Sequence, residues 1–267
     1  TTLGADCGIG MAAALAVLLD EKLERPAVEA LFTVDEETGL TGAFGLGEGM
    51  LTGKYLVNLD SEDEGEIFIG CAGGIDTVAR MPYDTEATPE GYAFVRLEIG
   101  DLLGGHSGDD IDKGRANSNK LLARFLYNAC DTFQIALRRM DGGNLRNAIP
   151  REAVAKVCTS DPEGFCAAVE KMAGVIRAEL SHDDDGFSIA LSQSEAAEKV
   201  MDADAQKKIL FLLATVQNGI FEMNHNIAGL VEFSRNLGVI ETKADGEVEF
   251  TFLARSPQAS HTDSSLE

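Results

Sequence analysis

The sequence has few basic residues and no tryptophan, and these shortages limit its possible functions. Its 267 residues contain 22 Lys and Arg against 45 Asp and Glu, which gives a formal net charge of −23. Binding to nucleic-acid or anionic-lipid phosphates requires clustered basic residues, so we predict no nucleic-acid partner and no membrane partner. The apolar content of 45% is ordinary and indicates a folded globular protein. The many carboxylates could serve as metal ligands, although most acidic side chains are simply solvated.

Long apolar runs and paired cysteines are also missing. No stretch approaches the roughly 18–20 apolar residues of a membrane span, and no signal sequence opens the chain. The cysteines are odd in number and scattered without CxxC spacing: Cys7, Cys71, Cys130, Cys158 and Cys166. We therefore predict no disulfide framework and a cytoplasmic location. Because the chain opens with Thr1 and residues 262–267 look like a helix cap without its helix, we expect a piece of a longer protein.

Residues 1–80 have the pattern of part of an α/β domain. An Ala/Leu-rich stretch over 8–20 predicts a buried helix, and strands are predicted where apolar runs end in acidic residues. Such alternation is typical of an open sheet whose site lies at the carboxyl edge of the strands. The expected strands are Val28–Val34, Lys54–Leu59, Ile67–Gly70 and Ile75–Arg80, the last two separated at Gly73-Gly74, with a short helix over Gly42–Met50.

Residues 81–267 have a different pattern, typical of a separate α+β domain. The expected order is β-α-β-β-α-β, which is a ferredoxin-like unit. A shorter helix near Ala205–Thr215 and three more strands then predict the start of a second such unit. The elements of the first unit are Tyr92–Gly100, Asn117–Thr132, Phe133–Met140, Ala153–Cys158, Pro162–Leu180 and Phe187–Leu191; the later strands are Phe221–Asn226, Gly229–Leu237 and Val248–Arg255.

Four acidic residues in the first 80 have the spacing of a metal site. Asp6 lies in a Gly-rich turn at a helix start, Glu36 and Glu37 follow one expected strand, and Asp60 follows the next. A dinuclear site needs carboxylates from several strand ends and a nearby base that is not a ligand. Adjacent glutamates can divide these tasks, because successive side chains diverge in direction. Acidic residues at loop starts also cap helices, so this pattern alone leaves both explanations open.

Seven short blocks along the chain form a further pattern: Thr2–Gly10, Thr33–Gly39, Asn58–Glu62, Gly70–Gly74, Gly104–Gly108, Arg146–Pro150 and Glu232–Gly238. Together these blocks resemble the aminoacyl-histidine dipeptidases, the Xaa-His branch of the di-zinc carboxypeptidase-like and aminoacylase clan. The resemblance covers essentially the whole chain, in the same order.

This resemblance implies a metal-dependent dipeptidase. Asp6 corresponds to a carboxylate bridging two Zn²⁺ ions (Co²⁺ or Mn²⁺ would also suit), Glu37 and Asp60 to terminal ligands, and Glu36 to the general base. The family also uses a His-x-Asp pair before the first of these blocks and a His near the carboxyl end, and neither is present here. We therefore expect the 267-residue chain to bind zinc weakly and to be inactive by itself.

The same resemblance implies substrate-binding residues in a lid domain. His106 would hold the carbonyl oxygen as it becomes an oxyanion, Asn147 would bind substrate, and Arg255 would pair with the terminal carboxylate. Without the resemblance, His106 would be a turn histidine and Arg255 a surface residue. The implied partners are a small peptide substrate and a second copy of the chain, bound through the lid. His182 is interpreted as part of a polar turn, and Cys7 as a residue packed under the helix start.

Two alternatives to a Xaa-His dipeptidase stay open at this point. One is another amidohydrolase on the same scaffold, such as an N-acyl amino acid deacylase or a tripeptidase, which would share the metal core. The other is a non-catalytic remnant that keeps the fold and has lost its chemistry by truncation.

Overall fold

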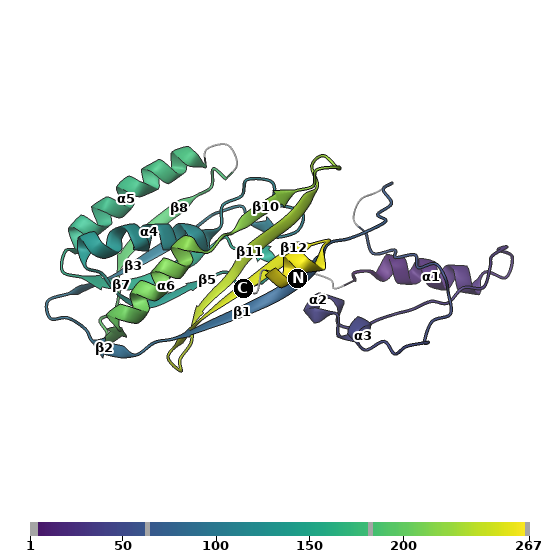
Figure 1. Ribbon diagram of the computed structural model, residues 1–267, viewed down its shortest axis with the longest axis horizontal. Helices are drawn as coiled ribbons and strands as arrows, with labels where there is room; N and C mark the ends of the chain where they lie inside the picture. The colour runs from purple at the N-terminus through teal and green to yellow at the C-terminus, as the bar shows by residue number, and fades with distance from the viewer. Residues whose placement is uncertain (1–4, 62–64, 181–183, 265–267) are drawn as a thin grey trace. The chain divides into compact units, whose positions relative to one another are not determined.

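An eight-stranded antiparallel sheet is the main element of the chain after residue 69 (Figure 1). The computed structural model describes residues 5–61, 65–180 and 184–264. Neighbouring strands follow the order β1-β12-β11-β5-β7-β3-β8, and β10 pairs with β11. The strands of this sheet are β1 (Gly73–Pro82), β3 (Ala93–Gly100), β5 (Ala136–Gly142), β7 (Ala153–Thr159), β8 (Ser188–Gln193), β10 (Gly219–Met223), β11 (Val231–Thr242) and β12 (Glu247–Ser256).

Three helices cover one face of this sheet (Figure 1). They are α4 (Ser118–Phe133), α5 (Pro162–Glu179) and α6 (Ala203–Thr215), and a short helix, α7 (Ala259–Ser264), follows β12. Each long helix begins after a polar cap, because the side chains of Asn117, Asp161 and Asp202 each accept a hydrogen bond from a backbone N–H of the first turn. Two small sheets complete the list: β2 (Thr85–Ala87) with β9 (Lys199–Met201), and β4 (Gly105–His106) with β6 (Ala148–Ile149).

The hydrophobic core of the chain lies between these helices and the sheet. On β3 the buried Leu97 and Ile99 alternate with the less buried Arg96 and Glu98, so one face of the strand packs on the helices. On α5 the buried residues recur at helical spacing: Phe165, Val169, Ala173 and Ile176. Burying a Phe, Val, Leu or Ile side chain contributes about 1.5–3 kcal/mol. The packing between the helices and the sheet is therefore the main source of stability.

The ferredoxin-like unit predicted from the sequence is confirmed. The order β3-α4-β5-β7-α5-β8 matches the expected elements, and β3 lies between β7 and β8. The strands β10, β11 and β12 do not form a sheet of their own, as a second unit would. They extend the same sheet, because β11 pairs with β5 at Ile240↔Gly142 and Glu241↔Asp141.

Residues 1–69 form a separate unit. Its helices are α1 (Gly8–Leu19), α2 (Glu36–Gly39) and α3 (Thr41–Phe44), and no strand occurs among its described residues. The predicted strands Val28–Val34, Lys54–Leu59 and Ile67–Gly70 are therefore not observed as strands. A strand requires a hydrogen-bonded neighbour, and the described residues of this unit provide none.

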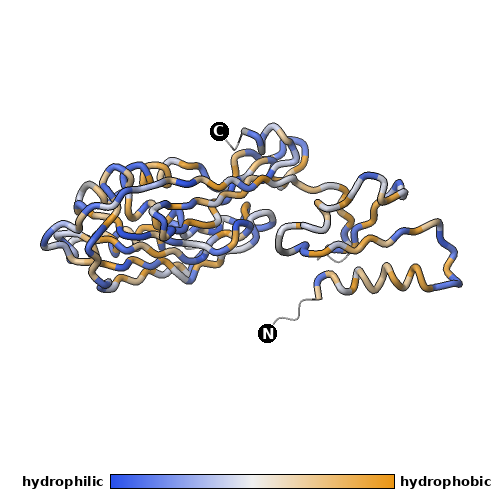
Figure 2. The backbone as a smooth tube through the Cα atoms, turned by 90° about the horizontal axis from the view of Figure 1, so that it is seen from below, coloured by the Kyte–Doolittle hydropathy of each residue, from blue (hydrophilic) through white to orange (hydrophobic). Residues whose placement is uncertain are grey.

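The predicted first helix is present, but the expectation that it is buried was wrong. Figure 2 shows apolar residues along much of α1, yet none of its residues is buried; Ile9 is 80% exposed and Leu19 is 77% exposed. A helix that is apolar on all sides needs cover on all sides, and the described residues of 1–69 are too few to supply it.

Throughout the structure, no helix among the described residues is long and apolar enough to cross a membrane.

The boundary between the units falls between Ile69 and Gly70, whereas the sequence placed it at residue 80. Strand β1 explains the difference, because it pairs with β12 along its whole length, from Gly73↔Ser256 to Pro82↔Glu247. Gly73 and Gly74 lie inside this strand and do not separate two strands.

A buried carboxylate closes the loop between β3 and α4. Asp184 is fully buried, and its two oxygens accept hydrogen bonds from the backbone N–H groups of Leu103 (2.9 Å) and Ala116 (3.1 Å). These two residues lie near the two ends of the loop that carries His106. A hydrogen bond to a charged group contributes about 1.5–3 kcal/mol, and a buried donor left without an acceptor is costly.

We predict that Asp184→Ala lowers the free energy of unfolding by about 3 kcal/mol, because two backbone N–H groups lose a charged acceptor. Denaturant unfolding measures the change. The adjacent Asp185 is exposed and provides the control, since Asp185→Ala should change stability by no more than about 0.5 kcal/mol. Equal effects of the two substitutions would contradict the anchoring role of Asp184.

Candidate metal centre and substrate-binding residues

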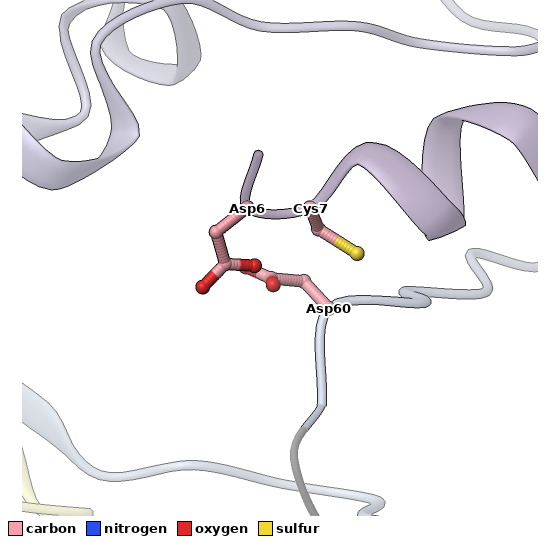
Figure 3. A group of neighbouring side chains, drawn as sticks. All are labelled: Asp6, Cys7 and Asp60. Carbon is pink, nitrogen blue, oxygen red and sulfur yellow. The ribbon is translucent and has the colours of Figure 1, made fainter. Parts of the chain in front are cut away.

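Two of the predicted metal ligands lie together in the structure. The carboxylates of Asp6 and Asp60 point toward one another beside the start of α1, with the thiol of Cys7 next to them (Figure 3). One potential ligand atom from each residue lies within 4.8 Å of the others. Among the described residues, these three side chains are the group of His, Cys, Asp or Glu found close enough together to hold a metal ion.

A close backbone approach holds these residues in place. The Cys7 thiol donates to the carbonyl oxygen of Leu59 at 3.6 Å, which ties the start of α1 to the residue before Asp60. Gly10 makes room for this contact, because a Cβ there would lie 2.7 Å from Cys7 Sγ and 3.2 Å from Leu59 Cβ. The packing of Cys7 under the helix start, expected from its small size, agrees with this arrangement.

The surroundings of the two carboxylates favour a cation. Neither side chain has a hydrogen-bond or ion-pair partner among the residues that the structure describes. Asp6 does not cap α1, whose N-cap residue is Cys7 and whose cap has no side-chain hydrogen bond. Two neighbouring carboxylates without cationic partners repel each other, and carboxylate oxygens suit Zn²⁺, Mn²⁺ and Co²⁺. The donor set therefore fits the divalent metal expected from the sequence.

The structure places Glu36 and Glu37 at the start of the short helix α2, and Glu36 is not part of this cluster. Glu36 begins α2 and is exposed, whereas the side chain of Glu37 lies outside the described residues. The turn is held by Thr41, whose hydroxyl donates to Asp35 Oδ2 at 2.8 Å. Asp35 has a positive φ of 56°, a backbone conformation that Asp adopts more readily than most residues. The Asp6 and Asp60 pair is thus brought together, and Glu36 is not part of that group.

The loop that carries His106 depends on two glycines. Gly104 and Gly105 have positive φ values of 61° and 145°. A Cβ at Gly104 would lie 2.2 Å from Arg151 Cγ, and one at Gly105 would lie 2.1 Å from Arg115 Nη1. No other residue fits these positions without displacing its neighbours.

His106 lies between an acidic and a basic side chain. Its Nδ1 is 2.7 Å from Asp109 Oδ2, and its Nε2 is 3.3 Å from Nη2 of Arg255. Arginine can only donate, so we assign the Nε2 lone pair as the acceptor and place the proton on Nδ1, where it is donated to Asp109. The structure thus brings His106 and Arg255 into contact, from positions 149 residues apart in the sequence.

Arg255 is a partly desolvated cation with unused hydrogen-bonding capacity. It lies on β12, is half-buried, and its Nε atom is buried without a hydrogen-bond partner among the described residues. Burial lowers the pKa of its guanidinium, and so does the charge of Arg146, whereas Asp109 and Asp76 act to raise this pKa. The guanidinium stays charged, and a carboxylate would satisfy its free donor. The simple surface role considered from the sequence does not describe this environment.

Asn147 is exposed and lies directly before β6, and its side chain has no hydrogen-bond partner among the described residues. Its carbonyl oxygen accepts from the backbone N–H of Ser107 at 2.8 Å, so Asn147 lies beside the residue that follows His106. Next to it, Arg146 Nε pairs with Asp76 Oδ2 at 2.8 Å. His106, Asn147 and Arg255 therefore belong to one group of neighbouring residues within the second unit.

The sequence interpretation missed two residues that shape these sites. Cys7 was not counted as a potential ligand, although it directly follows Asp6. Asp184 was passed over within a run of three aspartates, and no pattern in the sequence marks it as the buried one. His182 lies outside the described residues. His261 packs on the ring of Phe233, with the ring centroids 5.3 Å apart. His225 Nε2 lies 3.6 Å from Glu222 Oε1. Neither histidine contacts the candidate metal ligands or His106 in these interactions.

Comparison with known proteins gives a consistent result. The chain is 40% identical over 258 residues to the cytosol non-specific dipeptidase of Escherichia coli (strain K12), a match that covers 96% of this chain and 53% of that protein. It is also 30% identical over 181 residues to the uncharacterized protein YqjE of Bacillus subtilis (strain 168), covering 64% of this chain and 44% of that protein. No protein-family model matches the chain.

Among solved structures, aminoacylhistidine dipeptidase from Vibrio alginolyticus has the same fold. The TM-score is 0.83 with 38% sequence identity, and the match covers 100% of this chain and 55% of that one. The predicted mixed α/β class is thereby confirmed. The chain spans about half the length of the relatives it matches. Sequence identity along nearly the whole chain and a common fold show that this chain belongs to the dipeptidase family of these Escherichia coli and Vibrio alginolyticus proteins.

Proposed function

We propose that this chain carries part of the catalytic apparatus and the substrate-binding residues of a metal-dependent dipeptidase of the Xaa-His type. The proposal rests mainly on the close approach of the Asp6 and Asp60 carboxylates in a chain that belongs to a dipeptidase family. The Escherichia coli and Vibrio alginolyticus relatives are both named as dipeptidases, and the Escherichia coli protein is named for the cytosol, where we expect this protein as well.

In this proposal the first unit supplies the hydrolytic groups. Asp6 and Asp60 would hold divalent cations, with Glu37 as a further ligand. When bound, such cations acidify water and polarise the scissile carbonyl. Glu36 acts as the general base: its carboxylate accepts a proton from water and passes it to the leaving amine. The exposure of Glu36 at the start of α2 is compatible with this role.

The second unit recognises the peptide. Arg255 binds the terminal carboxylate, because its buried Nε has no partner in the described part of the chain and its guanidinium matches the two oxygens of a carboxylate. His106 stabilises the carbonyl oxygen as negative charge develops, for which its Nε2 must carry a proton. Substrate that draws the guanidinium of Arg255 away from Nε2 would allow that protonation, with Asp109 compensating the imidazolium charge. The side-chain amide of Asn147, which has no partner within the residues that the structure describes, is offered to the same ligand.

The first test is the substrate range of the complete protein. We predict hydrolysis of Ala-His that a chelator abolishes and that added Zn²⁺, Mn²⁺ or Co²⁺ restores, measured by release of free histidine. Gly-Leu and N-acetylated amino acids are the comparison substrates. Turnover of N-acetylated amino acids without turnover of dipeptides would favour a deacylase, and dipeptide hydrolysis that resists chelation would contradict the metal-dependent mechanism.

The second test is metal binding by the 267-residue chain itself. We predict weak zinc binding in calorimetric titration, because no histidine occurs before residue 106, and a further loss of about tenfold or more for Asp60→Asn, which removes one charged ligand. Asp20→Asn changes an exposed acid in the same unit and should leave zinc binding unchanged. Tight stoichiometric zinc together with dipeptide turnover by this chain would overturn the prediction of a weak, incomplete site.

The third test concerns Arg255. We predict that Arg255→Met in the complete protein raises KM for free dipeptides by about 10- to 100-fold, since a charge-assisted contact of about 1.5–3 kcal/mol is lost. Dipeptides with an amidated C-terminus should be far less affected. Arg96→Met, on β3, removes an arginine whose exposed pair with Glu98 contributes little, and should leave KM unchanged. An equal loss for free and amidated peptides would argue against carboxylate recognition by Arg255.

A further inference from the structure

The segment Glu232–Gly238 matches the dipeptidase pattern in sequence, but the proposed function gives it no role. It lies on β11, and one of its residues, Asn236, is only 1% exposed. A buried amide in a strand is costly unless its hydrogen bonds are made. The contacts of Asn236 therefore indicate what this segment does.

The Asn236 amide spans the residues on both sides of Asn147. Its Nδ2 donates to the carbonyl oxygen of Ala148 at 2.7 Å and to that of Arg146 at 3.2 Å. Both acceptors are carbonyl oxygens, so only the NH₂ group can face them, and the orientation of the amide is fixed by chemistry.

The other end of the same amide is attached to the core. Asn236 Oδ1 accepts from Nδ2 of Asn117 at 3.3 Å, and Asn117 is the buried N-cap residue of α4. The Asn117 side chain also accepts from the backbone N–H of Lys120 at 3.2 Å. A chain of hydrogen bonds thus runs from the first turn of α4 through Asn236 to the backbone around Asn147.

That backbone also determines where His106 lies. His106 pairs with Ala148 between β4 and β6, and the N–H of Ser107 donates to the carbonyl oxygen of Asn147. Since the exposed side chain of Asn147 has no partner among the described residues, its position is set by its backbone alone.

Gly238 completes the contact from the same segment. A Cβ at this position would lie 2.7 Å from the carbonyl oxygen of Arg146 and 2.9 Å from that of Leu145. The ladder between β11 and β12 has a register shift between Leu237 and Val239, so the strand bulges at Gly238. The loop before β6 consequently packs directly on the backbone of β11, within reach of the Asn236 amide.

We propose that Asn236 is a positioning residue, which fixes the backbone of residues 146–148 and through it the placement of Asn147 and His106. The consequence for substrate rests on the proposed function, in which those two residues bind the peptide. The placement itself follows from the contacts of Asn236 and can be tested without any enzymatic activity.

The test is amide hydrogen exchange in the 267-residue chain. Asn236→Asp keeps the size of the side chain but replaces the donor by an acceptor that faces two carbonyl oxygens. We expect the amides of Ser107 and Ala148 to exchange about tenfold faster or more relative to core amides of β3 and β7, such as those of Leu97 and Val157. Asn236→Ala, which introduces no buried charge, should give the same pattern if the Asp variant fails to fold.

Asn128 provides a matched control. Its Nδ2 also donates to a backbone carbonyl oxygen, that of Arg124 at 2.7 Å, but it lies on the exposed face of α4. Asn128→Asp should leave the exchange of Ser107 and Ala148 unchanged. If Asn236→Asp and Asn236→Ala leave these amides unchanged, or speed core amides by the same factor, then Asn236 only contributes to general stability and the proposal is overturned.

Kinetics of the complete protein separate this proposal from the proposed function. We expect Asn236→Asp to raise KM for dipeptides about tenfold or more, with a smaller change in kcat, and Asn128→Asp to change neither. Unchanged kinetic constants in a variant whose loop exchanges faster would overturn the link to substrate. Absence of any dipeptide hydrolysis in the unaltered protein would refute the proposed function, while the exchange result would still decide the structural role of Asn236.

Discussion

Repulsion between two neighbouring carboxylates is the physical constraint behind the proposed chemistry. Asp6 and Asp60 belong to segments far apart in the sequence, and the close approach of α1 to Leu59 brings them together. Neither forms an ion pair within the described residues, and Asp6 does not cap the helix. We propose that a divalent cation relieves this repulsion, and the meeting of the two carboxylates supports that proposal more directly than the acidic composition alone.

A comparable constraint acts on the residues proposed to bind substrate. Arg255 is partly desolvated, contacts His106, and has a buried donor for which the described residues provide no acceptor. Arg255 is held in place by its strand, β12. The loop that carries His106 and the loop before β6 are held by polar side chains that are themselves buried. Asp184 closes one loop and Asn236 holds the other. Of the residues proposed to bind substrate, His106 and Asn147 are exposed and Arg255 is half-buried, whereas Asp184 and Asn236 lie in the core.

The stability of the two units has different origins. The second unit has a continuous core between three helices and one face of the sheet. The described residues of the first unit include no buried side chain, and large apolar residues such as Phe44 (82% exposed) and Tyr55 (92% exposed) face solvent. The chain spans about half the length of its relatives, so the proposed activity belongs to the complete protein.

Local sequence patterns predicted the second unit well, because the residues that start and pack each of its helices lie within the helix or directly before it. The helix α5 has an Asp cap, a proline in its first turn and apolar residues at helical spacing, and its predicted range differs from the observed one by a single residue. The strands expected at Val28–Val34 and Lys54–Leu59 were not observed, because strand formation depends on a partner that local sequence does not specify. Likewise, the contacts of Asn236 and Asp184 join residues that are far apart in the chain and carry no local signal.

Zinc-edge anomalous diffraction from crystals of the complete protein would test the central claim most directly. An anomalous peak about 2.0–2.2 Å from a carboxylate oxygen of both Asp6 and Asp60 is the predicted result. Zinc bound tightly at a position that involves neither carboxylate would contradict the proposed metal centre.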